Sequence, residues 1–301
     1  MDTPLPERLA IDAFEIRLVD IRTVDIVQLH ALSIAVRWPH RAEDWQFLLD
    51  NGQGLAALDE IGRVLGSAMW FPHGETFATI GMVITSPRLQ TLGTGNALMQ
   101  AALEACKGRA IRLNATRAAK RLYLSLDFHS ECIVYQCQGD ATPYPDMSPE
   151  VADGEIRMVV ASDLAEIIAL DAAAFGVARP ELMTALLVKS VDATGLFRDG
   201  KLTAFAFCRR FGRGHVVGPV VAASDDDAHA VIAPHVEAHA GTFLRVDTHR
   251  DTSEFGTFLA SAGMPVFDTV TTMTKGRSFL NPNTLEPGRP RTYGLATQAL
   301  G

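Results

Sequence analysis

Apolar and polar residues follow the same succession of patterns twice along this chain of 301 residues. Residues 15–35 and residues 155–176 each begin with Glu-Ile-Arg in an alternating stretch, which predicts a strand, and continue with apolar residues at helical spacing. Residues 54–71 and residues 195–211 each predict two strands around a turn, and the Asp-Gly of the second turn is a strong hairpin signal. The pattern therefore predicts two copies of one mixed α/β unit.

The segment between the copies differs in composition from both of them. Residues 138–155 are rich in proline, glycine and aspartate, which is typical of a linker. We expect a first domain over residues 1–142 and a second domain over residues 152–301. The alternative is a chance similarity between two generic α/β domains.

Composition and charge exclude several classes of function. The net charge is -8 and the isoelectric point is about 5.6, which argues against nucleic-acid or anionic-membrane binding as the main role. No stretch approaches the roughly 18 apolar residues of a membrane span, and the N-terminus does not resemble a signal peptide. The four cysteines form no C-x-x-C pair, which fits reduced thiols in a cytoplasmic protein.

Two glycines, Gly93 and Gly95, stand between a predicted strand and a predicted helix. The first amides of a helix are unpaired, and its dipole favours an anion there. A loop without bulky side chains lets a phosphate group approach those amides. The sequence Q-T-L-G-T-G is neither a P-loop nor the dinucleotide fingerprint, so by itself it is equally explained by a tight turn.

This loop and the order of elements resemble the GNAT superfamily of acyl-CoA-dependent N-acetyltransferases. The family loop is Q/R-x-x-G-x-G/A, which Gln90, Gly93 and Gly95 match. A downstream family pattern, A-x-x-L-Y-x-x-x-G-F, is matched by Ala119, Leu122, Tyr123 and Phe128, with Asp127 in place of the glycine. The resemblance implies two tandem GNAT-like domains, each a mostly antiparallel central sheet flanked by helices, with a degenerate second domain.

The resemblance also implies the site residues for direct transfer of an acetyl group from acetyl-CoA to an amine. The strand edge at Met82, Val83 and Ile84 would pair with the pantetheine arm, and the Val83 amide would polarise the thioester carbonyl. The backbone of Gln90, Thr91, Leu92, Gly93, Thr94 and Gly95 would bind the pyrophosphate. Tyr123 matches the general acid, and Asn114 ends a strand that touches the cofactor arm. A packing aromatic and a turn-forming asparagine are the respective alternatives.

The acceptor side is less defined by the sequence. Candidates for the general base are His30, His40, Asp44, His73 and Glu75, and a water chain is the alternative. Trp38 and Trp45 either line an acceptor pocket or belong to the core, the latter being favoured for at least one of them. We expect a small amine or amino acid as acceptor, with a protein amine as the second option. A non-catalytic acyl-CoA sensor is the rival function, and it would not need Tyr123.

The second copy lacks the residues that carry this chemistry. Asp225, Asp226 and Asp227 stand where the first copy has its glycine loop, and they would repel a pyrophosphate. Leu259 stands at the position of Tyr123. We therefore expect the second copy to bind no acetyl-CoA and to support the fold, wall the acceptor site or pair subunits in a homodimer.

No metal site is expected in the second copy. The aspartate triplet does not have the spacing of a calcium loop. His229, His235 and His239 are assigned to an exposed polar helix face rather than to zinc. The final residues, 293–301, are expected to dock as a short helix or strand, or else to fray.

Overall fold

The structure, a computed structural model, describes residues 9–11, 14–87, 93–144, 151, 154–250, 254–278 and 288–301. Internal contacts divide the chain into two units, Met1–Leu113 and Asn114–Gly301. The two sequence repeats are called the first and second copy, and the two contact units the first and second unit. Because the division falls within strand β6, Ala110–Ala115, the residues Asn114 and Tyr123 of the first copy belong to the second unit.

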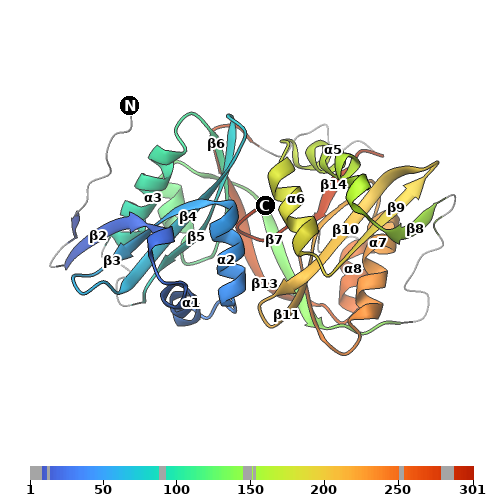
Figure 1. Ribbon diagram of the computed structural model, residues 1–301, viewed down its shortest axis with the longest axis horizontal. Coiled ribbons are helices and arrows are strands. Elements are labelled where there is room, and N and C mark those ends of the chain that lie inside the picture. The colour runs from blue at the N-terminus through green and yellow to red at the C-terminus, as the bar shows by residue number, and fades with distance from the viewer. Residues whose placement is uncertain are drawn as a thin grey trace. The chain divides into compact units, whose positions relative to one another are not determined.

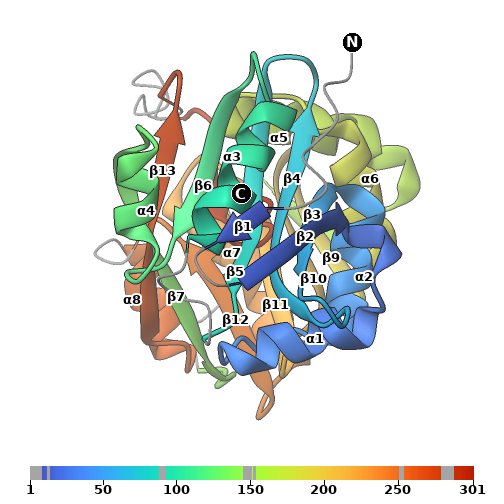
Figure 2. The ribbon, with the colours of Figure 1, turned by 90° about the vertical axis from the view of Figure 1, so that its left-hand side faces the viewer.

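The first unit is one sheet with helices on both sides. Its strands follow the order β1-β2-β3-β4-β5-β6, antiparallel except for the parallel pair β5 and β6. Figure 1 shows α3 on one side of this sheet and α2 on the other, and Figure 2 shows the sheet from the side of α3. The elements are β1 Leu9–Ile11, β2 Phe14–Asp20, α1 Ile26–Ala35, α2 Ala42–Asn51, β3 Gln53–Leu58, β4 Val64–His73, β5 Phe77–Thr85, α3 Thr94–Ala105 and β6.

The second unit is also a mostly antiparallel sheet. Its strand order is β13-β7-β12-β11-β10-β9-β8, with β14 added to β11 and with β11 and β12 parallel. Figure 1 shows α6 on one side of this sheet, with α7 and α8 on the other. The elements are α4 Lys120–Ser125, β7 His129–Asp140, β8 Glu155–Met158, α5 Leu164–Phe175, α6 Pro180–Lys189, β9 Asp192–Arg198, β10 Lys201–Phe211, β11 Gly214–Ala222, α7 Asp225–Ala238, β12 Phe243–Thr248, α8 Glu254–Ser261, β13 Val266–Lys275 and β14 Arg291–Gly294.

Local sequence explains the two predicted hairpins. The β3–β4 turn contains Gly62 at φ +82°, and the β9–β10 turn is formed by Asp199 and Gly200 at φ +50° and +73°. A two-residue hairpin turn with positive φ at both positions follows the natural strand twist. Both predicted turns are therefore confirmed.

Strand β7 pairs with strands of the second copy. The sequence repeat assigns β7 to the first copy, but it lies between β12 and β13, with pairs such as Val246↔Cys137 and Val270↔Val134. The division of the chain by contacts accordingly falls before β7, whereas the sequence indicates a boundary between residues 142 and 152. The final strands of both copies have similar length and alternation, so the pattern alone does not determine which sheet each one joins.

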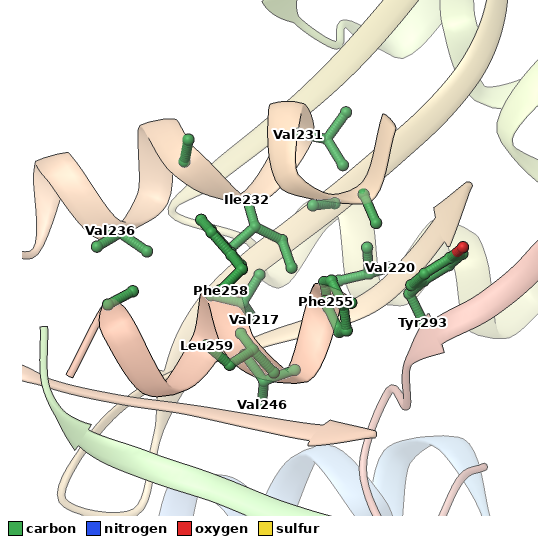
Figure 3. Close-up of a cluster of buried hydrophobic side chains, with 14 of the residues drawn as sticks. Val217, Val220, Val231, Ile232, Val236, Val246, Phe255, Phe258, Leu259 and Tyr293 are labelled. Atoms are coloured by element: carbon green, nitrogen blue, oxygen red, sulfur yellow. The ribbon is translucent and has the colours of Figure 1, made fainter. Parts of the chain in front are cut away.

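The core of the second unit lies between its helices and its sheet. Figure 3 shows Phe255, Phe258 and Leu259 of α8 between Ile232 and Val236 of α7 and Val217 and Val246 of the sheet. Val220 and Val231 belong to the same cluster, and all of these residues are buried. Tyr293 of β14 joins this cluster from the C-terminal segment. Strand β14 overlaps the first two of residues 293–301, for which the sequence predicts docking as a helix or strand. The rest of that segment is neither helix nor strand, but Leu295, Ala296 and Leu300 are buried, so it does not fray.

The predicted fold class, a mostly antiparallel sheet flanked by helices in each copy, is confirmed. Within the described ranges, none of the helices is long and apolar enough to span a bilayer.

Candidate functional site

A β-bulge interrupts the pairing of β4 with β5. The register passes from Ser67↔Ile84 to Met69↔Gly81, so that Met82 and Val83 together oppose a single residue of β4. Met82 takes a left-handed backbone conformation at φ +51°, which is uncommon for residues other than glycine. The bulge lies at the residues that the sequence predicts to contact the acyl-CoA arm.

The Met82–Val83 peptide has a defined direction in this bulge. The fully buried Ser67 hydroxyl donates a 2.7 Å hydrogen bond to the carbonyl oxygen of Met82. In a planar trans peptide, the following N–H points opposite to the carbonyl. The N–H of Val83 therefore points away from β4. Sequence reasoning missed Ser67, although a hydroxyl in an otherwise apolar strand signals a buried group that needs a partner.

Strand β5 extends beyond its pairing with β6. The parallel ladder runs from Phe77↔Ala110 to Ile80↔Leu113, while β5 continues through Gly81–Thr85. The side chains of Met82 and Ile84 are buried, so the backbone is the part of this stretch that a ligand can reach. A strand edge of this kind can pair with an extended chain.

The start of α3 has the features of an anion site. Gly93 caps the helix in a left-handed conformation at φ +85°, and Gly95 lies in the first turn. The Thr94 hydroxyl is buried and has no hydrogen-bond partner among the described residues, which indicates a missing polar partner. The unpaired amides and the dipole favour an anion at this place, so these residues fit a pyrophosphate. Gln90, Thr91 and Leu92 lie outside the described residues.

Gly66 of β4 lets α3 approach the sheet. A Cβ atom at this position would lie 3.0 Å from Cδ1 of Leu98 and 3.5 Å from Cγ2 of Thr94, both in α3. The first turns of α3 therefore rest directly on the strand that carries Ser67.

Tyr123 is held in the second unit by α4 and the turn that follows it. Its side chain is 4% exposed and packs edge-on against Phe128, with 5.9 Å between ring centroids. Burial raises the pKa of the Tyr123 phenol above its ordinary value, so the hydroxyl keeps its proton at neutral pH.

Asp127 occupies the turn position at which the GNAT pattern has glycine. It adopts the left-handed conformation at φ +62°, and the amide of Phe128 donates to the carbonyl of Tyr123 at 3.0 Å. Aspartate tolerates this conformation better than most residues. The departure from the family pattern therefore leaves the turn intact.

The Asn114 side chain is bonded to two elements of the second copy. Its amide nitrogen donates to the carbonyl of Gln298 at 2.8 Å, and its oxygen accepts from the Thr272 hydroxyl at 2.7 Å. These bonds give the side chain a structural role. A role for Asn114 at the cofactor arm stays a prediction.

The candidate bases differ in their surroundings. Asp44 accepts hydrogen bonds from the Arg41 side chain at 2.7 and 3.2 Å, and this ion pair raises the pKa of Arg41. His73 is buried and stacks on Phe77 at 5.8 Å, whereas Glu75 is exposed in the β4–β5 turn. His30 and His40 are half-buried. Asp44 is the least suited as a base because its carboxylate already binds a cation.

The two tryptophans also differ. Trp45 is fully buried and donates from Nε1 to the Ser33 hydroxyl at 2.7 Å, while Trp38 is half-buried beside His40. The prediction that at least one of them belongs to the core is confirmed by Trp45. Trp38 is the one that retains surface for an acceptor.

The second copy repeats the bulge with different residues. On β10 and β11 the register passes from Ala206↔Val220 to Cys208↔Val217, so Gly218 and Pro219 occupy the places of Met82 and Val83. Pro219 has no N–H. The second copy therefore lacks the amide that Val83 presents in the first.

The aspartates at the start of α7 are engaged within the second copy. The Asp227 carboxylate binds the guanidinium of Arg198 at 2.6 and 3.0 Å. Asp225 accepts from the Phe255 amide at 3.0 Å and from the Tyr293 hydroxyl at 2.7 Å. The helix start is thus occupied by the protein's own groups. Among the residues with defined placement, no three His, Cys, Asp or Glu side chains are grouped to hold a metal ion.

Leu259 of α8 stands at the position that Tyr123 has in the first copy. Leu259 is fully buried, and its carbonyl accepts a hydrogen bond from the Met264 amide. The Tyr123 carbonyl accepts the equivalent bond from Phe128, which supports the alignment of Leu259 with Tyr123.

The assignment of the α7 histidines to an exposed face is wrong for His235, which is 1% exposed and lies 3.0 Å from the Thr194 hydroxyl. Helix α7 packs against β9, β10 and β11 and against α8, so little of it faces solvent.

Comparison with known proteins matches both copies to the same family. Residues 24–128 match the model of the acetyltransferase (GNAT) family, and residues 167–285 match that of an acetyltransferase (GNAT) domain. The chain is 27% identical over 215 residues to the uncharacterized N-acetyltransferase YitH of Bacillus subtilis, covering 70% of this chain and 74% of that protein.

Solved structures share the fold over most of the chain. A crystal structure from Pyrococcus horikoshii, described as a proposed acetyltransferase, has a TM-score of 0.75 at 19% identity and covers 98% of this chain and 99% of its own. A tandem GNAT protein from the clavulanic acid biosynthesis pathway has a TM-score of 0.63 at 15% identity and covers 87% of this chain and 99% of its own. The present chain is a member of the GNAT superfamily with two GNAT domains in tandem.

Proposed function

We propose that this chain transfers an acetyl group from acetyl-CoA directly to an amine of a small molecule or amino acid. Membership of the GNAT family supports acyl transfer in general. The observation that carries the finer proposal is the bulge of the first copy, in which Ser67 holds the Met82 carbonyl and turns the Val83 N–H away from β4. When bound, acetyl-CoA supplies the activated acyl group as a thioester.

The residues of the first copy have distinct roles in this proposal. The Val83 N–H stabilises negative charge on a carbonyl oxygen, which is the largest single contribution in many acyl-transfer enzymes. The amides at Gly93, Thr94 and Gly95 bind the pyrophosphate together with the α3 dipole. Tyr123 holds a proton at Oη, as a general acid must, because burial keeps its pKa high.

The acceptor is assigned by charge. A net charge of -8 favours the approach of a cationic amine over that of an anionic substrate. The amine must lose a proton before it attacks. A protein amine is the second option for the acceptor.

Calorimetric titration with acetyl-CoA tests the proposal. We expect one molecule to bind per chain. Gly93→Glu should weaken that binding by about 100-fold, because a carboxylate at the start of α3 repels the pyrophosphate. The matched control is Gly108→Glu, which places the same charge on a glycine with nearly the same backbone angle, +83° against +85°, just beyond the other end of α3.

The outcomes separate the rival functions. Acetyl-CoA binding followed by turnover of at least one amine, with turnover reduced in Tyr123→Phe, supports the enzyme. Binding without turnover of any amine in a broad panel points to an acyl-CoA sensor. Absence of binding to the folded protein would reject both.

A further inference from the structure

The C-terminal strand β14 lies along the part of the second copy that corresponds to the stretch of β5 beyond its ladder with β6. Strand β14 pairs antiparallel with β11, with Arg291↔Ala222 and Gly294↔Val220 among its pairs. The ladder between β11 and β12 ends at Val216, the counterpart of Ile80 in the bulge alignment. Each copy therefore has a strand that outruns its parallel neighbour, and in the second copy the chain itself fills the place.

Beyond β14 the chain continues to the bulge of β11. The Leu295 amide donates to the carbonyl of Asp247, at the end of β12, at 2.8 Å. Arg209 donates to the carbonyls of both Gly218 and Ala296. A Cβ atom added to Gly218 would lie 2.0 Å from the carbonyl oxygen of Leu295, so the segment contacts the bulge backbone directly.

The other end of the segment reaches the start of α7. The Tyr293 hydroxyl donates to Asp225 at 2.7 Å, in the first turn of the helix. The Arg250 guanidinium lies 4.4 Å from the Tyr293 ring centroid and 3.5 Å from the same carboxylate. One extended segment thus runs from the helix start to the bulge, which are the counterparts of the two places that the proposed function assigns to pyrophosphate and thioester.

We propose that Arg291–Ala296 is a built-in occupant of the acyl-CoA groove of the second copy, following the path that the acyl-CoA arm would take. The inference rests on the proposed function of the first copy. With this segment in place, acyl-CoA cannot enter the groove of the second copy. The aspartates of α7 and the missing amide at Pro219 agree with this, because neither would serve a bound acyl-CoA.

Peptide-resolved hydrogen exchange on the full chain, with and without saturating acetyl-CoA, tests this inference. We expect exchange at Gly81–Thr85 to slow about tenfold or more on binding, while exchange at residues 291–296 stays within about twofold. Gly218→Ala should accelerate exchange at residues 291–296 about tenfold, because the new methyl group meets backbone rather than a flexible side chain.

The control is Gly195→Ala in β9 of the same sheet, where the three atoms nearest to an added Cβ all belong to side chains, those of Leu202, Val159 and Phe197. It should leave exchange at residues 291–296 unchanged. If Gly218→Ala does not fold, Tyr293→Phe replaces it, because it removes only the bond to Asp225.

Three results would overturn the inference. Faster exchange at residues 291–296 on addition of acetyl-CoA, or a second molecule bound per chain, would make the segment a displaceable lid. Unchanged exchange in Gly218→Ala would show that the bulge does not hold the segment. Absence of acetyl-CoA binding anywhere would reject the proposed function and leave the segment a purely structural strand. Exchange in Gly218→Ala would still test whether the bulge of β11 holds this strand.

Discussion

The bulge of β5 and the bulge of β11 have the same register but opposite consequences. In the first, Ser67 holds the carbonyl of Met82, and the amide of Val83 points away from β4. In the second, Arg209 holds the carbonyl of Gly218, and the next residue, Pro219, has no amide to offer. The backbone frame has been kept in both copies while the donor has been kept in only one.

The starts of helices α3 and α7 also differ in whether their first turn is already occupied by groups of the protein. At α3, Gly93 leaves the first turn free of side-chain caps. At α7, Ser224 accepts from the Asp227 amide at 3.2 Å, and Asp225 and Asp227 bind neighbouring residues of the second copy. A binding site can therefore be lost through local substitutions while strand order and helix placement remain.

The largest expected effect comes from transferring the second-copy residue to the first. Val83→Pro should lower kcat by about 100- to 1000-fold, because it removes the amide that stabilises developing negative charge. Steady-state kinetics with acetyl-CoA and an accepted amine measures this, alongside circular dichroism to verify folding. Val83→Ala keeps the amide and serves as control. Activity of folded Val83→Pro within tenfold of wild type would rule out this amide as the donor.

Tyr123→Phe should lower kcat by about 100-fold through loss of the general acid. Burial raises the pKa of Tyr123, so its hydroxyl should keep its proton up to the ordinary tyrosine pKa of about 10. Below that pH, the wild-type kcat should therefore show no alkaline decline caused by Tyr123. A pH profile of kcat checks both points. Tyr293→Phe removes a hydroxyl from the second copy and should leave kcat unchanged. A wild-type alkaline decline that disappears in Tyr123→Phe would contradict the raised pKa.

The turns after α7 and α8 should differ in their tolerance of an added side chain. Gly263→Ala should lower the free energy of unfolding by about 2–3 kcal/mol, because its φ is +84° and a Cβ atom would lie 2.3 Å from the Asp140 carbonyl oxygen. Denaturant titration measures the change. The control Gly241→Ala also has positive φ, +72°, but no atom within 4 Å of the added Cβ. Equal losses in both variants would mean that the contact with Asp140 contributes nothing.

His235 makes the stability of the second copy depend on pH. Burial lowers the pKa of His235 to about 4, below its ordinary 6.5. The unfolded chain then binds the proton more readily, so stability is full above pH 6.5 and falls as the pH drops toward 4, by about 2 kcal/mol at pH 5. Denaturant titrations at pH 7.5 and pH 5 measure this. In His235→Gln the difference should shrink by that amount, and an unchanged difference would assign it to other groups.

The smallest effect is expected at Asp127, the left-handed residue in the turn after α4. Asp127→Gly relieves backbone strain but frees the unfolded chain and removes an exposed pair with Lys275 at 3.4 Å, so the net change should stay within about 1 kcal/mol. Denaturant titration compares it with Asp127→Ala, which has neither the freedom of glycine nor the polar side chain of aspartate and should be less stable than both. A loss above 2 kcal/mol in Asp127→Gly would show that the Asp127 side chain holds this turn.

Much of the fold could be predicted because short local patterns of residues determine it. The alternation of β3 and β4 around Gly62, and the Asp199–Gly200 turn, each specify a hairpin without reference to the rest of the chain. The loss of the glycine loop at Asp225–Asp227 could also be seen in the sequence alone. The position of the bulge, by contrast, depends on the pairing of two strands and appears only in the structure.

Contacts between distant segments could not be predicted. Strand β7 alternates in a way that suits either sheet, so nothing in residues 129–140 indicates that β12 and β13 are its neighbours. Asn114 bonds to Gln298, 184 positions away. His235 was misjudged because a helix that packs on nearly all sides has no clear polar face.

The placement of β7 sets an order of events during protein synthesis. Strand β7 ends at Asp140, while β12 begins at Phe243 and β13 follows later still. At about 5–20 residues per second, the ribosome needs about 5–20 s to make the intervening hundred or so residues. During that interval β7 has neither of these neighbours, and its two edges are open to other chains. Expression should therefore depend on chaperone supply more than the stability of the finished protein would indicate.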